Sequence, residues 1–193
     1  MITISLFLGG LSYKTFFQTK IWKDSVTLWS TVLKSYPHIS LALYNLGKAY
    51  EYQNRNDLAL LNYTEAIRHK PSYAEAYNNR GNIYQKIGQD DLALQNFNKA
   101  IEYSPTLAKA YNNRGNIYQK TGQYNLALAD INKALELDPK STQAYNNRGL
   151  FYFSQQSFSL ALSDFNKALA INSDDEDAYY NRGIFTKPRD NMS

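Results

Sequence analysis

The sequence predicts an all-α protein, an α-solenoid of antiparallel helix pairs, and three observations predict it. First, the segment Tyr-Asn-Asn-Arg-Gly occurs at residues 77–81, 111–115 and 145–149, so each copy follows the last by 34 residues. A period of this length indicates a stacked repeat. Second, apolar and small residues within each copy recur at spacings of three and four, which is typical of amphipathic helices. Third, glycine and proline divide each copy at fixed places, where helices are expected to end.

Composition narrows the classes of function. The chain has 193 residues, of which 44% are hydrophobic and 20% charged, and this balance indicates an ordered protein. It has no cysteine and two histidines, which excludes a disulfide framework, a thiolate zinc site and a cysteine nucleophile. The net charge of +4 comes without a dense basic block, so we expect no nucleic-acid partner. No phosphate-binding loop, dinucleotide motif or nucleophile elbow is present, so we expect no enzyme, cofactor or metal.

The N-terminal segment, residues 1–20, is predicted as an apolar helix. Its first twelve residues carry no charge, yet a bilayer-spanning helix needs about 20 apolar residues. Three interpretations stay open: the end of a membrane helix whose beginning precedes this chain, a buried or interfacial helix, and a weak signal or anchor. We therefore expect membrane association through the N-terminus, with a cytoplasmic protein as the alternative.

Residues 21–39 predict half of a repeat unit. Ser25, Trp29 and Val32 take the places of a second helix, and Pro37 ends it. The segment 1–20 would then stand where a first helix is expected.

A complete unit is predicted to contain two helices. In residues 74–87, Tyr77, Gly81 and Tyr84 share one helical face, and Gly88 ends this first helix. Residues 91–104 form the second helix. Its apolar stripe consists of Leu92, Ala93, Phe97, Ala100 and Ile101, and Pro105 ends the unit.

The units follow one another without insertions. Residues 74–107 and 108–141 agree at 22 of 34 positions. The predicted array spans residues 40–185 and divides into units 40–73, 74–107, 108–141, 142–175 and a partial unit 176–185, followed by a tail at 186–193.

These residues resemble the tetratricopeptide repeat (TPR) family, which implies a right-handed superhelix. In the second unit the family positions fall on Tyr77, Arg80, Gly81, Tyr84, Ala93, Phe97, Ala100 and Pro105. Two features depart from the pattern: Ser173 replaces the final proline of the fourth unit, and arginine takes an apolar position. We expect the arginine stems to pack and their heads to reach water or carboxylates, with Asp130 and Asp164 as partners.

The resemblance implies a concave groove lined by the first helix of each unit. The groove is predicted to be rich in amides, which both donate and accept hydrogen bonds and so suit a peptide backbone. The candidate peptide-binding residues are Asn45, Lys48, Asn78, Asn79, Asn82, Gln85, Asn112, Asn113, Asn116, Gln119, Asn146, Asn147 and Asn181.

One asparagine position repeats through all five units, at residues 45, 79, 113, 147 and 181. It is similar to the asparagine ladder in the TPR groove of O-GlcNAc transferases, which holds extended peptides. The alternative is that these amides only bond to the adjacent unit. The basic clamp of chaperone-binding TPR proteins is a poorer match, because most of its places here hold Asn, Tyr or Gln.

Two functions follow from the resemblances. The first is a non-catalytic scaffold that binds a protein or peptide, as an extended peptide or partner helix, in the concave groove. The alternative comes from residues 21–29, which resemble the junction before the C-terminal TPR array of bacterial membrane glycosyltransferase-like proteins of the protein O-mannosyltransferase type. This chain would then be the acceptor-binding region of such a protein.

Overall fold

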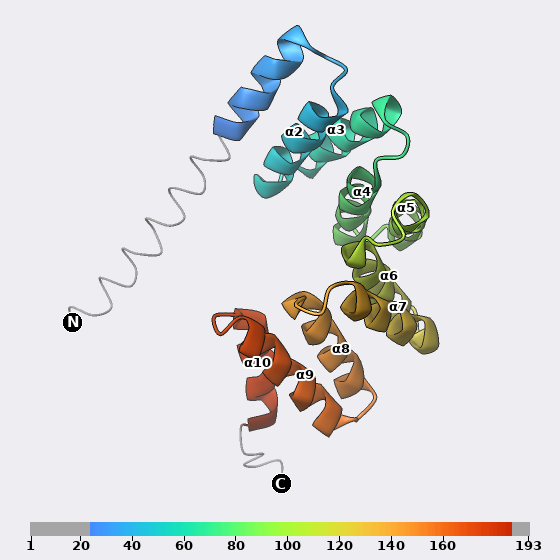
Figure 1. Ribbon diagram of the computed structural model, residues 1–193, viewed down its shortest axis with the longest axis vertical. Helices are drawn as coiled ribbons and strands as arrows, with labels where there is room; N and C mark the ends of the chain where they lie inside the picture. The colour runs from blue at the N-terminus through green and yellow to red at the C-terminus, as the bar shows by residue number, and fades with distance from the viewer. Residues whose placement is uncertain (1–23, 187–193) are drawn as a thin grey trace, which may run out of the picture.

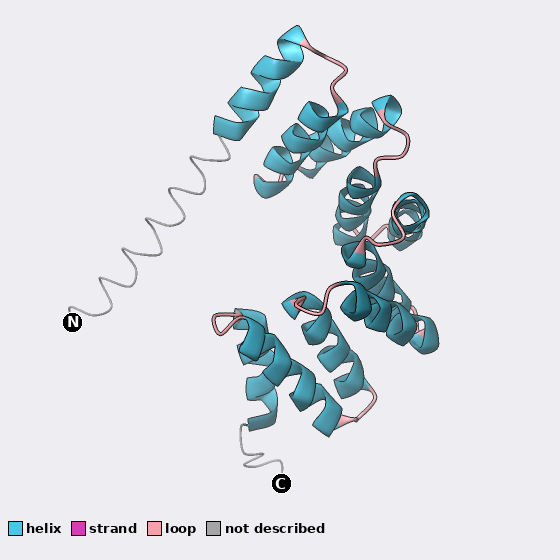
Figure 2. Ribbon diagram, in the orientation of Figure 1, coloured by secondary structure: helices cyan, strands magenta, loops and turns pink. Residues whose placement is uncertain are grey.

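The computed structural model describes residues 24–186, and this part of the chain consists of helices and turns without a strand (Figure 2). A helix over residues 24–35 comes first. The helices that follow are α2 (Ser40–Tyr52), α3 (Asn56–His69), α4 (Ala74–Lys86), α5 (Asp90–Tyr103), α6 (Ala108–Lys120), α7 (Tyr124–Leu137), α8 (Thr142–Ser154), α9 (Phe158–Ile171) and α10 (Glu176–Thr186).

The helices form successive antiparallel pairs along a curved path (Figure 1). Successive first helices, α4, α6, α8 and α10, also contact one another, whereas the second helices α3, α5, α7 and α9 are spread apart. The first helices therefore lie on the inner side of the curve. In the second unit, α4 and α5 end within one residue of the predicted bounds, so the repeat pattern is confirmed there.

Each pair is held together by a bulky side chain of the second helix lying against a glycine of the first. A Cβ built on Gly81 would lie 2.7 Å from Cε1 of Phe97, and one on Gly115 would lie 2.9 Å from Cγ1 of Ile131. Phe97 and Ile131 are fully buried. The glycines are therefore required for close approach of the two helices, as the apolar pattern predicts.

The turn inside each unit contains one residue with a left-handed backbone. Gly88 and Gly122 have φ angles of 79° and 76°, and Asn54 and Gln156 take the same position in the first and fourth units with 57° and 58°. Glycine adopts this conformation without steric cost, whereas a residue with a Cβ does not.

The arginines bind the carboxylates predicted for them. Arg114 donates from Nε and Nη2 to Asp130 at 2.7 and 2.9 Å, and from Nη1 to Asn98 of the preceding unit at 2.7 Å. Arg148 repeats this arrangement with Asp164 at the same two distances. These hydrogen bonds raise the pKa values of both guanidinium groups.

The second unit holds its arginine differently. Arg80 donates to the Oδ1 atom of Asn96 at 2.8 Å and to the hydroxyl of Thr64 at 3.1 Å. Among the described residues no carboxylate contacts Arg80, and burial lowers its pKa.

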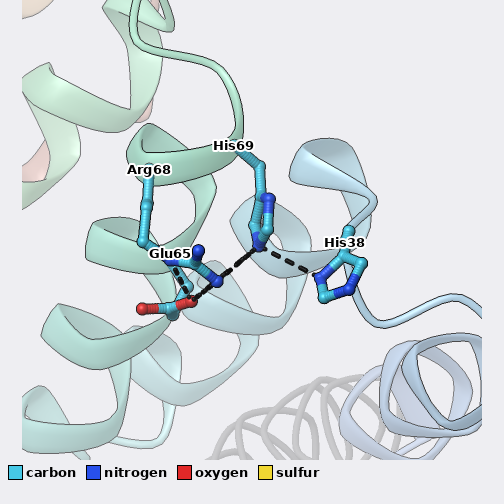
Figure 3. Close-up of polar contacts among 4 residues, drawn as sticks. All are labelled: His38, Glu65, Arg68 and His69. Atoms are coloured by element: carbon cyan, nitrogen blue, oxygen red, sulfur yellow. Dashed lines mark hydrogen bonds and ion pairs between the residues drawn. The ribbon is translucent and has the colours of Figure 1, made fainter.

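Two histidines join the segment after the first helix to the first unit (Figure 3). Nδ1 of His38 lies 3.3 Å from Nε2 of His69, which also lies 2.8 Å from Nη2 of Arg68. Arg68 in turn donates from Nε to Glu65 at 2.9 Å. Because a guanidinium only donates, Nε2 of His69 accepts, which favours a neutral ring. Burial, then Arg68 and His38, lower the pKa of His69.

The membrane prediction depends on residues outside the described range. The predicted apolar helix, residues 1–20, lies there. Among residues 24–186, no helix has the length and apolar character needed to span a bilayer. The helix over residues 24–35 agrees with the predicted second helix of a half unit, and its Leu33 packs against the core around Leu43 and Ile67.

Candidate peptide-binding groove

All candidate groove residues lie on the first helices, and most of the asparagines are at least partly buried there. Asn78, Asn112 and Asn146 are between 3% and 6% exposed. Side chains with so little exposure need partners inside the protein.

Asn78 and Asn112 accept hydrogen bonds from asparagines of the next unit. Asn113 donates from Nδ2 to Oδ1 of Asn78 at 3.0 Å and to Oδ1 of Asn82 at 2.8 Å. Asn147 donates from Nδ2 to Oδ1 of Asn112 at 3.0 Å. These bonds form a ladder of amides that links the first helices of neighbouring units.

The ladder begins with tyrosines at its N-terminal end. Asn79 donates from Nδ2 to the hydroxyls of Tyr44 and Tyr63 at 3.2 and 3.4 Å. The hydroxyl of Tyr63 donates to Glu51 at 2.6 Å. Burial, followed by Glu51, raises the pKa of Tyr63 well above its ordinary value. Nearby, burial raises the pKa of Tyr73 to about 12.

A second set of side-chain amides lies beside the ladder and has donors and acceptors that are free to bind a ligand. Gln85, Asn116 and Gln119 are partly exposed, and the described residues provide no hydrogen-bond partner for their side-chain amides. Asn82 uses its oxygen in the ladder, so its two N–H donors remain. This set can pair with both N–H and C=O groups of a bound backbone.

The remaining candidates lie near the two ends of the groove. Asn45 and Asn181 are partly exposed, and Nζ of Lys48 lies 5.6 Å from the ring centre of Tyr44.

The inner side of the array is hollowed in two places. One hollow includes Tyr44, Glu75, Asn78, Asn79, Lys109 and Asp138. The other includes Gln143, Asn146, Asn147, Asp175, Asp177 and Asn181. Tyr44, Asp175 and Asp177 were not among the predicted groove residues. Tyr44 occupies the repeat position of Asn78 and Asn112, and this register could have identified it.

The repeats match known families over most of the array. A sequence-family model described as a tetratricopeptide repeat matches residues 108–141 and 142–175. A second family model, described as a TPR repeat, matches residues 47–88 and 81–122. The chain belongs to the tetratricopeptide repeat family. The array is thus the right-handed TPR superhelix that the sequence predicts.

Solved TPR structures share this architecture. TTC0263, a thermophilic TPR protein in Thermus thermophilus, is 22% identical, with 88% of this chain and 93% of that chain covered and a TM-score of 0.74. MamA is 25% identical, with 79% and 89% covered and a TM-score of 0.65. The first TPR of Spaghetti (RPAP3), bound to an HSP90 peptide, is 26% identical, with 57% and 88% covered and a TM-score of 0.54. No curated protein matches this chain.

The described part of the TPR array offers a concave surface for binding. Within residues 24–186, no three His, Cys, Asp or Glu side chains come together as metal ligands. The hydroxyl of Tyr63, whose pKa is strongly raised, is buried and donates to Glu51. It also accepts from Asn79 and is therefore part of the amide ladder.

Proposed function

We propose that this protein is a non-catalytic scaffold that holds an extended peptide in the concave groove of its TPR array. One observation carries the proposal: the partly exposed amides of Gln85, Asn116 and Gln119 line successive first helices without an intramolecular partner among the described residues. The buried ladder beside them keeps the units in register, so the exposed amides are presented in a fixed order.

The spacing of this amide row suits an extended chain. Packed helices lie about 8–10 Å apart, and an extended peptide advances about 3.3–3.6 Å per residue. One unit therefore corresponds to about two to three peptide residues. Amide groups pair with any backbone, so side-chain pockets would provide the selectivity.

A peptide-bound relative supports this class of function. The first TPR of Spaghetti (RPAP3) was solved with an HSP90 peptide, and its fold is similar to part of this chain. The groove here is lined mainly by amides, so we do not extend that peptide's identity to this protein. A partner helix in the groove and the glycosyltransferase-linked role both stay predictions, and the latter depends on residues 21–29.

The test is selection of binding peptides followed by paired variants. A library of random dodecapeptides would be selected against the full chain, and the affinity of a recovered peptide measured by fluorescence anisotropy. The variant N116A/Q119A should weaken binding about tenfold, because two hydrogen bonds are lost. The control Q95A/N125A removes two exposed amides from the second helices and should have no effect. Failure to recover peptides, or equal losses in both variants, would overturn the proposal.

A further inference from the structure

The amide ladder is incomplete at its C-terminal rung. In the second and third units, Oδ1 of Asn78 and of Asn112 accepts from the asparagine that lies 35 residues later. The same rule pairs Asn146 with Asn181. Yet Oδ1 of Asn146 has no hydrogen-bond donor among the described residues. The atom is buried, and the residue as a whole is only 6% exposed.

The orientation of the Asn146 amide is set by its other partner. Its Nδ2 donates to Oδ1 of Asp175 at 3.2 Å, and the same oxygen accepts the backbone N–H of Ala178 at 2.9 Å. An ionised carboxylate accepts only, so a flipped amide would bring two acceptors together. Oδ1 of Asn146 therefore points away from Asp175 and needs a donor from elsewhere, since a buried acceptor without one is costly. Because this atom is buried, a donor in the neighbouring hollow reaches it only when the Asn146 side chain turns toward the hollow.

The charges that line the surrounding hollow indicate which chemical group could supply that donor. At one repeat position the second to fifth units carry Glu75, Lys109, Gln143 and Asp177. The N-terminal hollow thus contains a Lys109 cation beside its acids, whereas the C-terminal hollow contains the carboxylates of Asp175 and Asp177 and no cation among its described lining residues. A donor that carries positive charge satisfies both the amide oxygen and the carboxylates.

We propose that the C-terminal hollow binds a primary ammonium group, the side chain of a lysine in the peptide held by the groove. An ammonium has three donors that point in different directions, which suits acceptors on Asn146, Asp175 and Asp177. The planar guanidinium of arginine instead matches two oxygens of one carboxylate. This inference rests on the proposed function, because it assigns one side chain of the bound peptide.

The site can be tested without knowing the natural peptide. The probe is N-acetyl-lysine N-methylamide, and its uncharged counterpart is N-acetyl-norleucine N-methylamide. Each is titrated into the ¹⁵N-labelled full chain while the side-chain NH₂ signals of Asn146 and Asn181 are followed by NMR. The lysine probe should shift these signals in a saturable manner, and the norleucine probe should not. Equal responses to both probes, or none, would overturn the inference.

Variants separate the site from general effects of charge. Asp177→Asn should weaken binding of the lysine probe about two- to fivefold, as expected for an exposed ion pair. Asp91→Asn is the matched control, because Asp91 is likewise an exposed acid in the first turn of a helix. Asn146→Leu should weaken binding at least tenfold while the thermal melt confirms a folded chain. Unchanged affinity in Asn146→Leu would contradict the assignment.

The proposed function and this inference fail separately. Suppose that selected peptides bind in a manner that depends on Asn116 and Gln119 while the lysine probe produces no shift. That result would support the proposed peptide-binding groove and contradict the ammonium site.

Discussion

Gly149 lies so close to the ring of Phe165 that a Cβ built on the glycine would be 2.5 Å from the Cε1 atom. The ring is fully buried between the two helices of the fourth unit, so it has little room to move. The same contact recurs as Gly47 with Tyr63 and Gly81 with Phe97. This contact sets how closely the helices of a pair approach.

Substitution of Gly149 should therefore destabilise the array. Gly149→Ala is expected to lower the free energy of unfolding by about 2 kcal/mol, because overpacking displaces the Phe165 ring. Gly183→Ala is the matched control at the same repeat position, where a Cβ would have no atom of the described residues within 4 Å. Alanine there should be neutral or stabilise by about 0.5–1 kcal/mol through helix propensity. Urea unfolding followed by circular dichroism measures both, and equal effects would contradict the packing argument.

Removal of the Asp164 carboxylate, the partner of Arg148, should destabilise the protein. Asp164 is 2% exposed and receives two hydrogen bonds from that guanidinium. Asp164→Ala should cost about 3 kcal/mol, because it leaves a partly buried charge without its partner. Asp164→Asn should lower the free energy of unfolding less, since in the second unit Asn96 accepts the corresponding hydrogen bond from Arg80. Thermal and urea unfolding would show the order, and a costlier Asn variant would be evidence against it.

The turn of the fourth unit should gain stability from glycine. Gln156 has a φ of 58° where the second and third units have Gly88 and Gly122. Gln156→Gly should raise the free energy of unfolding by about 1 kcal/mol, because the left-handed backbone costs a residue with a Cβ about that amount. Gly122→Ala should lower it by a similar amount. A decrease in Gln156→Gly would show that its side chain has another role.

The histidine contact should weaken in mild acid. The folded state lowers the pKa of His69, so its neutral form is favoured. The resulting stability is present above the unfolded pKa of about 6.5 and is lost as pH falls through the lower folded value. NMR titration of the ring protons should give a pKa for His69 below about 6.5. Arg68→Ala should raise that pKa, because a neighbouring positive charge is removed, and an unchanged value would contradict this cause.

The local structure was predictable because it repeats. The 34-residue period predicted the helix pairs, and Gly81, Phe97 and their repeats predicted the packing inside each pair. The pairing of Arg114 with Asp130 and of Arg148 with Asp164 followed from the cost of an unpaired charge near the core. These interactions lie within one unit, at separations that the repeat itself displays.

The groove was less predictable. The sequence placed the amides on one helical face, but it left open whether Asn113 and Asn147 bind a ligand or the adjacent unit. The structure gives them partners in the preceding unit, 35 residues away. It also brings His38 to His69 and orients Asn146 toward Asp175, which no spacing in the sequence indicated.

The sequence by itself determined that this chain is a TPR array, the bounds of the second unit's helices to within one residue, and which residues fill each helix pair. Only the tertiary structure decided which amides are occupied and which remain available in the groove. The reason is physical: hydrophobic periodicity reports burial within a helix pair, whereas the hydrogen bond of a side chain depends on the distance and direction of an atom in the next unit.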